Sequence, residues 1–193
     1  MNKQDVVAVV LGGPSSEAEV SRRTGGAIAE ALREKGYNAV EVELVPEKLV
    51  EQLREIDAKV VFNAVHGMYG EDGRLQSILE AIKMPYTGSG VLASAVAMDK
   101  VATKRFLISA NISTPKCLMY NKRFDNDMAK IEKEIIATFG VPVVIKAADQ
   151  GSSIGVEIVK AEAYVAAALE NTFKYSDLFW LRNASTARNL LVA

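Results

Sequence analysis

Runs of β-branched and apolar residues that alternate with helix-forming segments are the strongest constraint on the fold of this chain. The first run, VVAVVL at residues 6–11, contains no polar residue and predicts a strand that is buried on both faces. NAVEVEL (38–44) and KVVFNAV (59–65) predict two further strands. A helix capped by Ser15 or Ser16 and ending at Gly36, and a second helix after Pro46, would connect them. Strands that alternate with helices in this way predict an α/β fold with a parallel, doubly wound sheet.

The pattern changes after a helical stretch at residues 92–111, and we place a domain boundary near Asp99 within it. A strand around KCLMY (116–120) and a helix at about 126–139 come next. Two strands joined by a Gly/Ser turn follow within residues 141–159, and then a helix from Ala161 to about Lys174. We therefore expect a second, smaller α+β unit. The remaining residues show neither helical nor strand periodicity.

Composition and charge narrow the class of partner. The 193 residues carry a net charge of -1, and their Lys and Arg residues are scattered along the chain. This pattern argues against nucleic acid or an anionic membrane as the main partner and favours small molecules. The single cysteine, Cys117, excludes an internal disulfide framework, and the apolar run near the N-terminus is too short for a signal peptide or a membrane span. We expect a cytoplasmic protein.

The only histidine of the chain, His66, lies in the stretch HGMYGEDGRLQ at residues 66–76. A turn this rich in glycine loses much backbone entropy on ordering and gains little apolar burial, so packing alone explains it poorly. Ligands of open α/β sheets bind at the carboxyl ends of the strands, where this loop and the earlier GGPSSEAEV loop are both expected. Glu17 and Glu19 begin the helix of that earlier loop, and the helix dipole alone is a sufficient reason for two acids there. The same helix start also suits a zwitterionic ligand, with Glu17 taking its ammonium group.

A second group of candidate residues lies in KAADQGSSIGVEIV, at residues 146–159. Lys146 ends an apolar strand, and the glycines and serines of residues 151–155 offer free backbone N–H groups and hydroxyls that suit a polyphosphate. A plain hairpin with a Gly/Ser turn explains the same residues equally well. Lys100 and Lys104 lie one helical turn apart, and a solvated helix surface is the simpler interpretation of that pair.

The order of four motifs along the chain is more specific than any one of them. LGGPSSEAEVS, HGMYGEDGRLQ, PYTGSGVLASAVAMDK and VVIKAADQGSSIGV, in this order, resemble the D-alanine–D-alanine ligase family of ATP-grasp enzymes. The resemblance covers residues 5 to about 177. It departs at Ser77, where the family usually has glycine, and at Ala147, where proline commonly follows the lysine.

The resemblance implies a reaction and its substrates. ATP phosphorylates the carboxylate of one D-alanine to an acyl phosphate, the amine of a second D-alanine attacks it, and the dipeptide enters peptidoglycan synthesis. Glu17 would bind the ammonium group of the first D-alanine and, together with Ser152, would help hold a loop closed over the site. His66 would orient this first substrate. The resemblance also implies a homodimer formed through the N-terminal domain.

The ATP site implied by the resemblance involves the second half of the chain. Lys100 and Lys146 would grip the phosphates of ATP as point charges. The turn with Gly151, Ser152 and Ser153 would act as a lid that excludes water from the acyl phosphate. The family also uses two divalent ions, Mg²⁺ or Mn²⁺, whose Asp, Glu and Asn ligands lie in a large subdomain that we do not find in this sequence. Without those ligands we expect this chain alone not to ligate efficiently.

The resemblance divides the chain into an N-terminal substrate-binding domain (1–98), the small subdomain of an ATP-grasp fold (99–177) and an aberrant tail (178–193). Near Asp177 the family continues with a strand resembling VLVEKFIDGREFT, whereas this chain reads LFWLRNASTARNLL. If every synonymous codon is allowed, a shifted reading frame of the tail permits VLVEKCIDGTEFT. One hypothesis is therefore a frameshift after Asp177, and coding DNA with stop codons in that shifted frame would exclude it.

Other functions remain open at this point. A genuine short homologue with its own C-terminal helix is the alternative to the frameshift. A non-catalytic module that binds ATP or an amino acid is the alternative to a ligase. Fragments of enzymes that join D-alanine to D-lactate or D-serine fit the same motifs.

Overall fold

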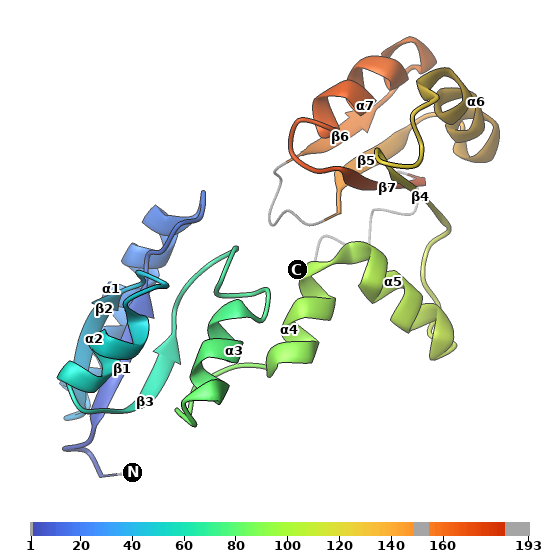
Figure 1. Cartoon of the computed structure of the whole chain (residues 1–193). Helices are drawn as coiled ribbons and strands as arrows, with labels where there is room; N and C mark the ends of the chain where they lie inside the picture. The colour runs from blue at the N-terminus through green and yellow to red at the C-terminus, as the bar shows by residue number, and fades with distance from the viewer. Residues whose placement is uncertain (1, 149–154, 184–193) are drawn as a thin grey trace. The chain divides into compact units, whose positions relative to one another are not determined.

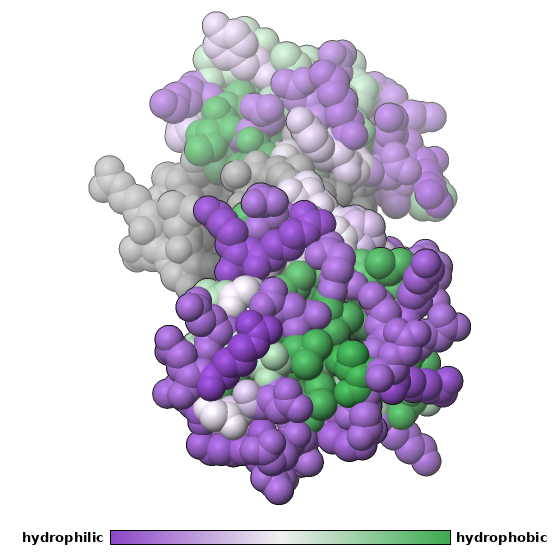
Figure 2. All heavy atoms as spheres, turned by 90° about the vertical axis from the view of Figure 1, so that its left-hand side faces the viewer, coloured by the Kyte–Doolittle hydropathy of each residue, from purple (hydrophilic) through white to green (hydrophobic). Residues whose placement is uncertain are grey.

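The computed structural model describes residues 2–148 and 155–183, with the backbone alone for 178–183. The chain divides into two compact units, Met1–Ala97 and Met98–Ala193, each with its own sheet (Figure 1). Among the described residues, no helix is both long and apolar enough to cross a membrane. Hydrophilic residues cover most of the face shown in Figure 2, around a smaller area of apolar residues.

A parallel sheet forms the centre of the first unit. Its strands are β1 (Val6–Leu11), β2 (Asn38–Glu43) and β3 (Ala58–Asn63), in the order β2-β1-β3. Its helices are α1 (Ala18–Glu34), α2 (Leu49–Glu55), α3 (Arg74–Ala81) and α4 (Val91–Met98). The chain crosses from β2 over β1 to β3, so the first and the later connections lie on opposite faces of the sheet.

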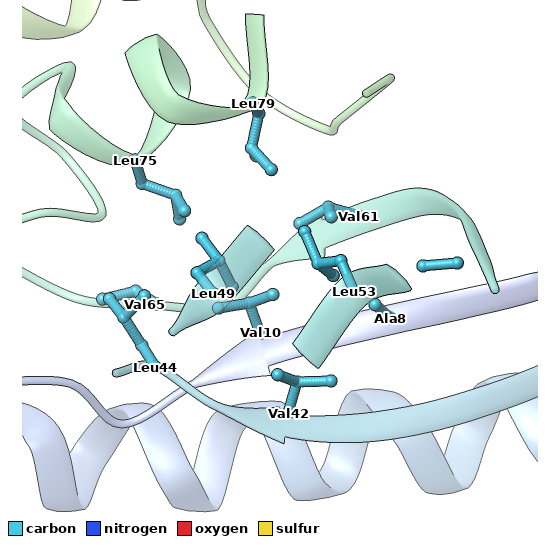
Figure 3. Packing of buried hydrophobic residues seen from close by; sticks show 11 residues of the cluster. Ala8, Val10, Val42, Leu44, Leu49, Leu53, Val61, Val65, Leu75 and Leu79 are labelled. Atoms are coloured by element: carbon cyan, nitrogen blue, oxygen red, sulfur yellow. The ribbon is translucent and has the colours of Figure 1, made fainter. Parts of the chain in front are cut away.

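Alternate residues of β1 enter two separate cores. Val9 and Leu11 pack with Ala29 of α1 on one face. Ala8 and Val10 face the opposite way, into a larger core that contains two leucines each from α2 and α3 (Figure 3). The members of that core are Ala8, Val10, Val42, Leu44, Leu49, Leu53, Ala58, Val61, Val65, Leu75 and Leu79. Helices therefore cover both faces, which confirms the predicted doubly wound sheet.

The second unit begins with α5 (Lys100–Ser109) and contains an antiparallel sheet. Its strands are β4 (Cys117–Asn121), β5 (Val143–Ala147), β6 (Val156–Val159) and β7 (Leu178–Asn183), in the order β4-β7-β5-β6. Two helices, α6 (Met128–Phe139) and α7 (Val165–Thr172), pack against this sheet, and a short 3-10 helix, Glu162–Tyr164, precedes α7. The expected small α+β unit is thus confirmed.

The structure corrects two details of the sequence prediction. Helix α1 begins at Ala18, and neither Ser15 nor Ser16 is its N-cap, because Glu17 holds that position without a side-chain cap hydrogen bond. The stretch predicted as one helix at 92–111 is two helices, because Asp99 caps α5 by accepting hydrogen bonds from the N–H groups of residues 101 and 102.

Candidate functional site

The loops that follow β1 and β3 leave the parallel sheet at the same edge, because these two strands are direct parallel neighbours. Ser21 of α1 lies between the loop after β1 and the loop after β3 and links them by hydrogen bonds. Its hydroxyl accepts a hydrogen bond from the Gly12 N–H at 2.8 Å and donates one to the Ala64 carbonyl at 2.7 Å, and the side chain is fully buried. Ser15 adds a second link, since its Oγ donates to the His66 carbonyl at 2.9 Å.

Glu17 and His66, which the sequence predicts as a substrate site, are brought together at this edge. A Cβ atom added at Gly67, the residue next to His66, would lie 2.7 Å from Oε2 of Glu17. The carboxylate therefore lies directly over the backbone of the histidine loop. Gly67 has a φ of +68°, a left-handed conformation that glycine adopts without strain. The loop thus needs glycine for its backbone conformation and for the close approach of Glu17.

The imidazole of His66 lies between two polar side chains. Its Nε2 atom is 3.3 Å from Oγ1 of Thr24, on α1. Its Nδ1 atom is 3.7 Å from Oε1 of Glu71, further along the same loop. The side chain of His66 is 34% exposed, so the ring is held at its edges while part of it faces solvent.

Hydrogen bonds order the histidine loop despite its glycines. The Gly70 carbonyl accepts from Nδ2 of Asn63 at 2.8 Å and from Nε2 of the buried Gln76 at 2.7 Å. The Asp72 carboxylate accepts from the backbone N–H of Tyr69 and of the residue at position 74. Tyr69 has a φ of +72°, which is rare for an aromatic residue and requires such support. The loop is therefore a fixed part of the site.

The loop after β1 is held by a carboxylate from β2. Glu43 accepts two hydrogen bonds from the Arg22 guanidinium, at 2.7 and 3.1 Å, and one from the Gly13 N–H at 3.3 Å. The hydrogen bonds from Arg22 lower the pKa of Glu43 below its ordinary value. Glu43 also lines an open cavity of about 730 Å³ at this edge, together with Gly13, Met68, Tyr69 and other residues of the three loops. The edge of the sheet is accordingly both ordered and accessible.

In the second unit, the two lysines predicted to bind phosphate lie near the end of β5. Lys146 is the fourth residue of this strand and pairs with Val156 of β6. The backbone N–H of Lys100 and its Nζ atom both lie within hydrogen-bond distance of the Ala148 carbonyl, at 3.1 and 3.3 Å. The two lysines therefore converge on the chain segment where β5 ends. The predicted lid residues Gly151, Ser152 and Ser153 lie outside the described residues.

The simpler interpretation of Lys100 and Lys104 placed both on a solvated helix surface. For Lys104 this prediction is wrong. Lys104 is 7% exposed, and its Nζ atom donates to Oγ1 of Thr114 at 2.7 Å and contacts the Pro115 carbonyl. An ammonium group that is buried needs such partners. Lys104 thus attaches α5 to the segment that leads into β4.

Sequence reasoning missed three residues of the first site: Thr24, Ser21 and Glu71. A signal for two of them was available, because positions 17, 21 and 24 lie four and three residues apart and share one face of a helix. The third, Glu71, is part of the histidine motif, but the sequence alone does not show that its carboxylate faces the imidazole.

The two units together define a class of protein. A doubly wound parallel sheet with glycine-containing loops at one edge, followed by a small antiparallel sheet with lysines at a strand end, is the first part of an ATP-grasp ligase fold. Family models for the "D-ala D-ala ligase N-terminus" and the "D-ala D-ala ligase C-terminus" match residues 43–89 and 106–193. The chain belongs to the D-alanine–D-alanine ligase family.

Individual relatives agree with this assignment. The chain is 44% identical to a curated D-alanine–D-alanine ligase from Moorella thermoacetica over 94% of its own length and 58% of the relative's. It is 45% identical to that of Carboxydothermus hydrogenoformans over 79% of its length and 49% of the relative's. A solved D-alanine–D-alanine ligase from Bacillus anthracis matches with a TM-score of 0.81 and 33% identity, over 93% of this chain and 57% of that one. The structure of the Bacillus anthracis enzyme with ATP gives a TM-score of 0.79. The chain thus spans about half the length of these relatives, from 49% to 58%.

Proposed function

We propose that this chain provides the substrate-binding domain and the first ATP-binding subdomain for ATP-dependent ligation of two D-alanines. The observation that carries the proposal is the position of the Glu17 carboxylate directly over the loop of His66, at the carboxyl edge of the parallel sheet. A carboxylate at this edge suits the ammonium group of an amino acid. The relatives that share both units are named D-alanine–D-alanine ligases, which supports D-alanine as this amino acid.

The proposed reaction has two steps. A carboxylate oxygen of the first D-alanine attacks the γ-phosphorus of ATP, so that an acyl phosphate forms and ADP leaves. The amine of the second D-alanine then attacks the acyl carbon, loses a proton and releases inorganic phosphate as the peptide bond forms. Glu17 holds the ammonium group of the first substrate, and His66 orients it so that its carboxylate points away from the loop.

Lys100 and Lys146 bind the phosphates of ATP in this proposal. Lys100 Nζ lies 3.3 Å from the Ala148 carbonyl, and Lys146 belongs to the end of β5, so two lysines of this segment are available as point charges for a polyphosphate. Gly151, Ser152 and Ser153, which lie outside the described residues, would act as a lid over the acyl phosphate. This last role rests on the resemblance alone.

The described part of the chain contains no cluster of side chains suited to the divalent ions that the family uses. No group of three or more His, Cys, Asp or Glu side chains there could hold a metal ion. We expect this chain by itself to bind ATP and D-alanine without forming the dipeptide, and dipeptide formation by the purified chain would contradict this expectation.

The cellular setting is part of the proposal. D-alanyl-D-alanine is a building block for peptidoglycan precursors, which are made in the cytoplasm. A homodimer through the N-terminal domain is supported by α4, whose sequence VLASAVAM has no charged residue and whose Leu92 is 71% exposed. Sedimentation of the purified chain measures its oligomeric state directly.

The ATP site is tested by titrating the chain with ATP and measuring the heat of binding by calorimetry. Removal of one lysine–phosphate contact by Lys146→Ala should weaken ATP binding about 10- to 100-fold. Lys160→Ala is the matched control, because Lys160 is exposed and lies beyond the end of β6. Equal ATP affinity of the two variants would exclude Lys146 from the phosphate site.

A further inference from the structure

One face of α1 carries the side chains that touch the histidine loop. Glu17 stands at the N-terminal end of this face, Ser21 follows one turn later and Thr24 almost one turn after that. Glu17 lies over Gly67, and Ser21 donates a hydrogen bond to the Ala64 carbonyl. Thr24 reaches the imidazole itself. A single rigid helix thus sets the position of the carboxylate and of the ring beside it.

Helix α1 can hold this position because it approaches β1 very closely. A Cβ atom added at Gly25 would lie 2.6 Å from Cβ of Leu11, so only glycine permits the observed packing. The neighbouring Thr24 is half-buried by the same approach. Its hydroxyl therefore has a fixed location 3.3 Å from Nε2 of His66.

The two neighbours of the ring determine which nitrogen carries the proton in the neutral imidazole. The Glu71 carboxylate can only accept a hydrogen bond, and it faces Nδ1. The Thr24 hydroxyl can donate or accept, and it faces Nε2. At 3.7 Å the Nδ1–Oε1 contact is electrostatic and not a hydrogen bond, and it favours a proton on Nδ1, which leaves Nε2 to accept the hydrogen of the Thr24 hydroxyl.

We propose that Thr24 is a positioning residue for His66: its hydroxyl holds the imidazole through Nε2 and, together with the Glu71 carboxylate on the other side of the ring, favours the tautomer that is protonated on Nδ1. The importance of this ring orientation for D-alanine binding rests on the proposed function, in which His66 orients the first substrate. Thr24 itself does not need to touch the substrate. It presents the ring in one orientation and one protonation state to the space beside Glu17.

The test uses the fact that His66 is the only histidine of the chain, so every imidazole signal in a nuclear magnetic resonance spectrum belongs to it. Long-range ¹H–¹⁵N correlation spectra of the ¹⁵N-labelled chain report Nδ1 and Nε2 separately. Spectra are recorded at several pH values from about 5 to 9, so that the neutral and the protonated ring are distinguished. For the neutral ring of the wild-type chain we expect the ¹⁵N shift of a protonated nitrogen at Nδ1 and of an unprotonated one at Nε2.

Two variants separate positioning from packing. Thr24→Val keeps the shape of the side chain and removes the hydroxyl, so the two ¹⁵N shifts should move toward each other as the tautomers mix. Thr24→Ser keeps the hydroxyl and should retain the wild-type shifts. If Thr24 only fills space, Thr24→Val will leave both shifts unchanged, and that result would overturn the proposal. A wild-type ring protonated on Nε2 would also overturn it.

A D-alanine titration of the same samples connects the tautomer to the site. We expect Thr24→Val to weaken D-alanine binding about two- to tenfold, with Thr24→Ser close to wild type. The tautomer spectra contain no ligand, so their outcome judges Thr24 alone. If D-alanine moves no signal of the wild-type chain, the proposed role of His66 fails and the tautomer result still stands.

Discussion

The replacement of Gly67 by alanine tests how closely Glu17 approaches the histidine loop. The new Cβ would lie 2.7 Å from Oε2 of Glu17, which is closer than a carbon and an oxygen can approach without a shift. The atom that must move is the far end of a flexible side chain. The displacement therefore costs little stability, but it removes the carboxylate from the place where the proposed function needs it.

The backbone contributes a second effect that can be measured separately. Gly67 has a φ of +68°, and a left-handed conformation costs a residue with a side chain about 1–2 kcal/mol. For a chain of this size, that cost lowers the melting temperature by roughly 2–4 °C per kcal/mol. Gly36→Ala is the matched control, because Gly36 has a φ of +82° and an added Cβ would meet only Lys3, at an ordinary 3.8 Å. Both variants should lose similar stability.

Only Gly67→Ala should lose affinity for D-alanine. A hydrogen bond between a charged carboxylate and the substrate ammonium contributes about 1.5–3 kcal/mol, so its loss should raise the Kd about 10- to 100-fold. The assay is a D-alanine titration followed by the His66 ring signals, beside thermal unfolding of both variants by circular dichroism. The reasoning is refuted if Gly67→Ala binds D-alanine as well as Gly36→Ala does, or if both variants lose affinity equally.

Two further predictions concern the links around the site. Ser21→Ala should lower the free energy of unfolding by about 2–4 kcal/mol in urea titrations, because it leaves the Gly12 N–H and the Ala64 carbonyl without their partner in a buried place; the exposed Ser77→Ala should cost far less. Glu43→Gln should reduce the acid sensitivity of folding. The folded-state pKa of Glu43 is lowered by Arg22, so its carboxylate contributes stability above the ordinary value of 4.5, and this stability is lost as the pH falls through the lower folded value. Identical unfolding curves for Glu43→Gln and wild type from neutral pH down to about pH 3 would contradict this account.

The strands of the first unit were predictable because each contains valines in a recognisable pattern, continuous in β1 and alternating with polar residues in β2. The residues of β1 are uniformly apolar, and both of its faces are covered by helices. The expected meeting of Glu17 and His66 followed from the rule that loops after parallel strands share one edge. The structure places both residues as that rule predicts, since β1 and β3 are neighbours.

Elements without such a pattern were missed. Helix α3 begins directly after Gly73, so its first turn overlaps the glycine-rich motif of His66, which has no helical periodicity. Strand β7 showed no periodicity in the sequence, although its backbone pairs with both β4 and β5. An interior strand depends on its neighbours on both sides, and these lie far away in the sequence.

Tertiary contacts also changed the interpretation of single residues. Lys104 looks like a surface residue from its spacing, yet it is buried because Thr114 and the Pro115 carbonyl supply partners for its ammonium group. The spacing of Glu17, Ser21 and Thr24 places Thr24 on the same helix face, but it does not show what the Thr24 hydroxyl contacts. Only the position of the loop after β3 shows that its hydroxyl reaches His66.

The central claim is that the edge with Glu17 and His66 binds D-alanine, and one titration tests it most directly. The ¹⁵N-labelled chain is titrated with D-alanine and, separately, with L-alanine, while the ring signals of His66 are followed. We predict a saturable shift with D-alanine and a much weaker response to L-alanine. Signals that remain unchanged by D-alanine, or that respond equally to both enantiomers, would contradict the account.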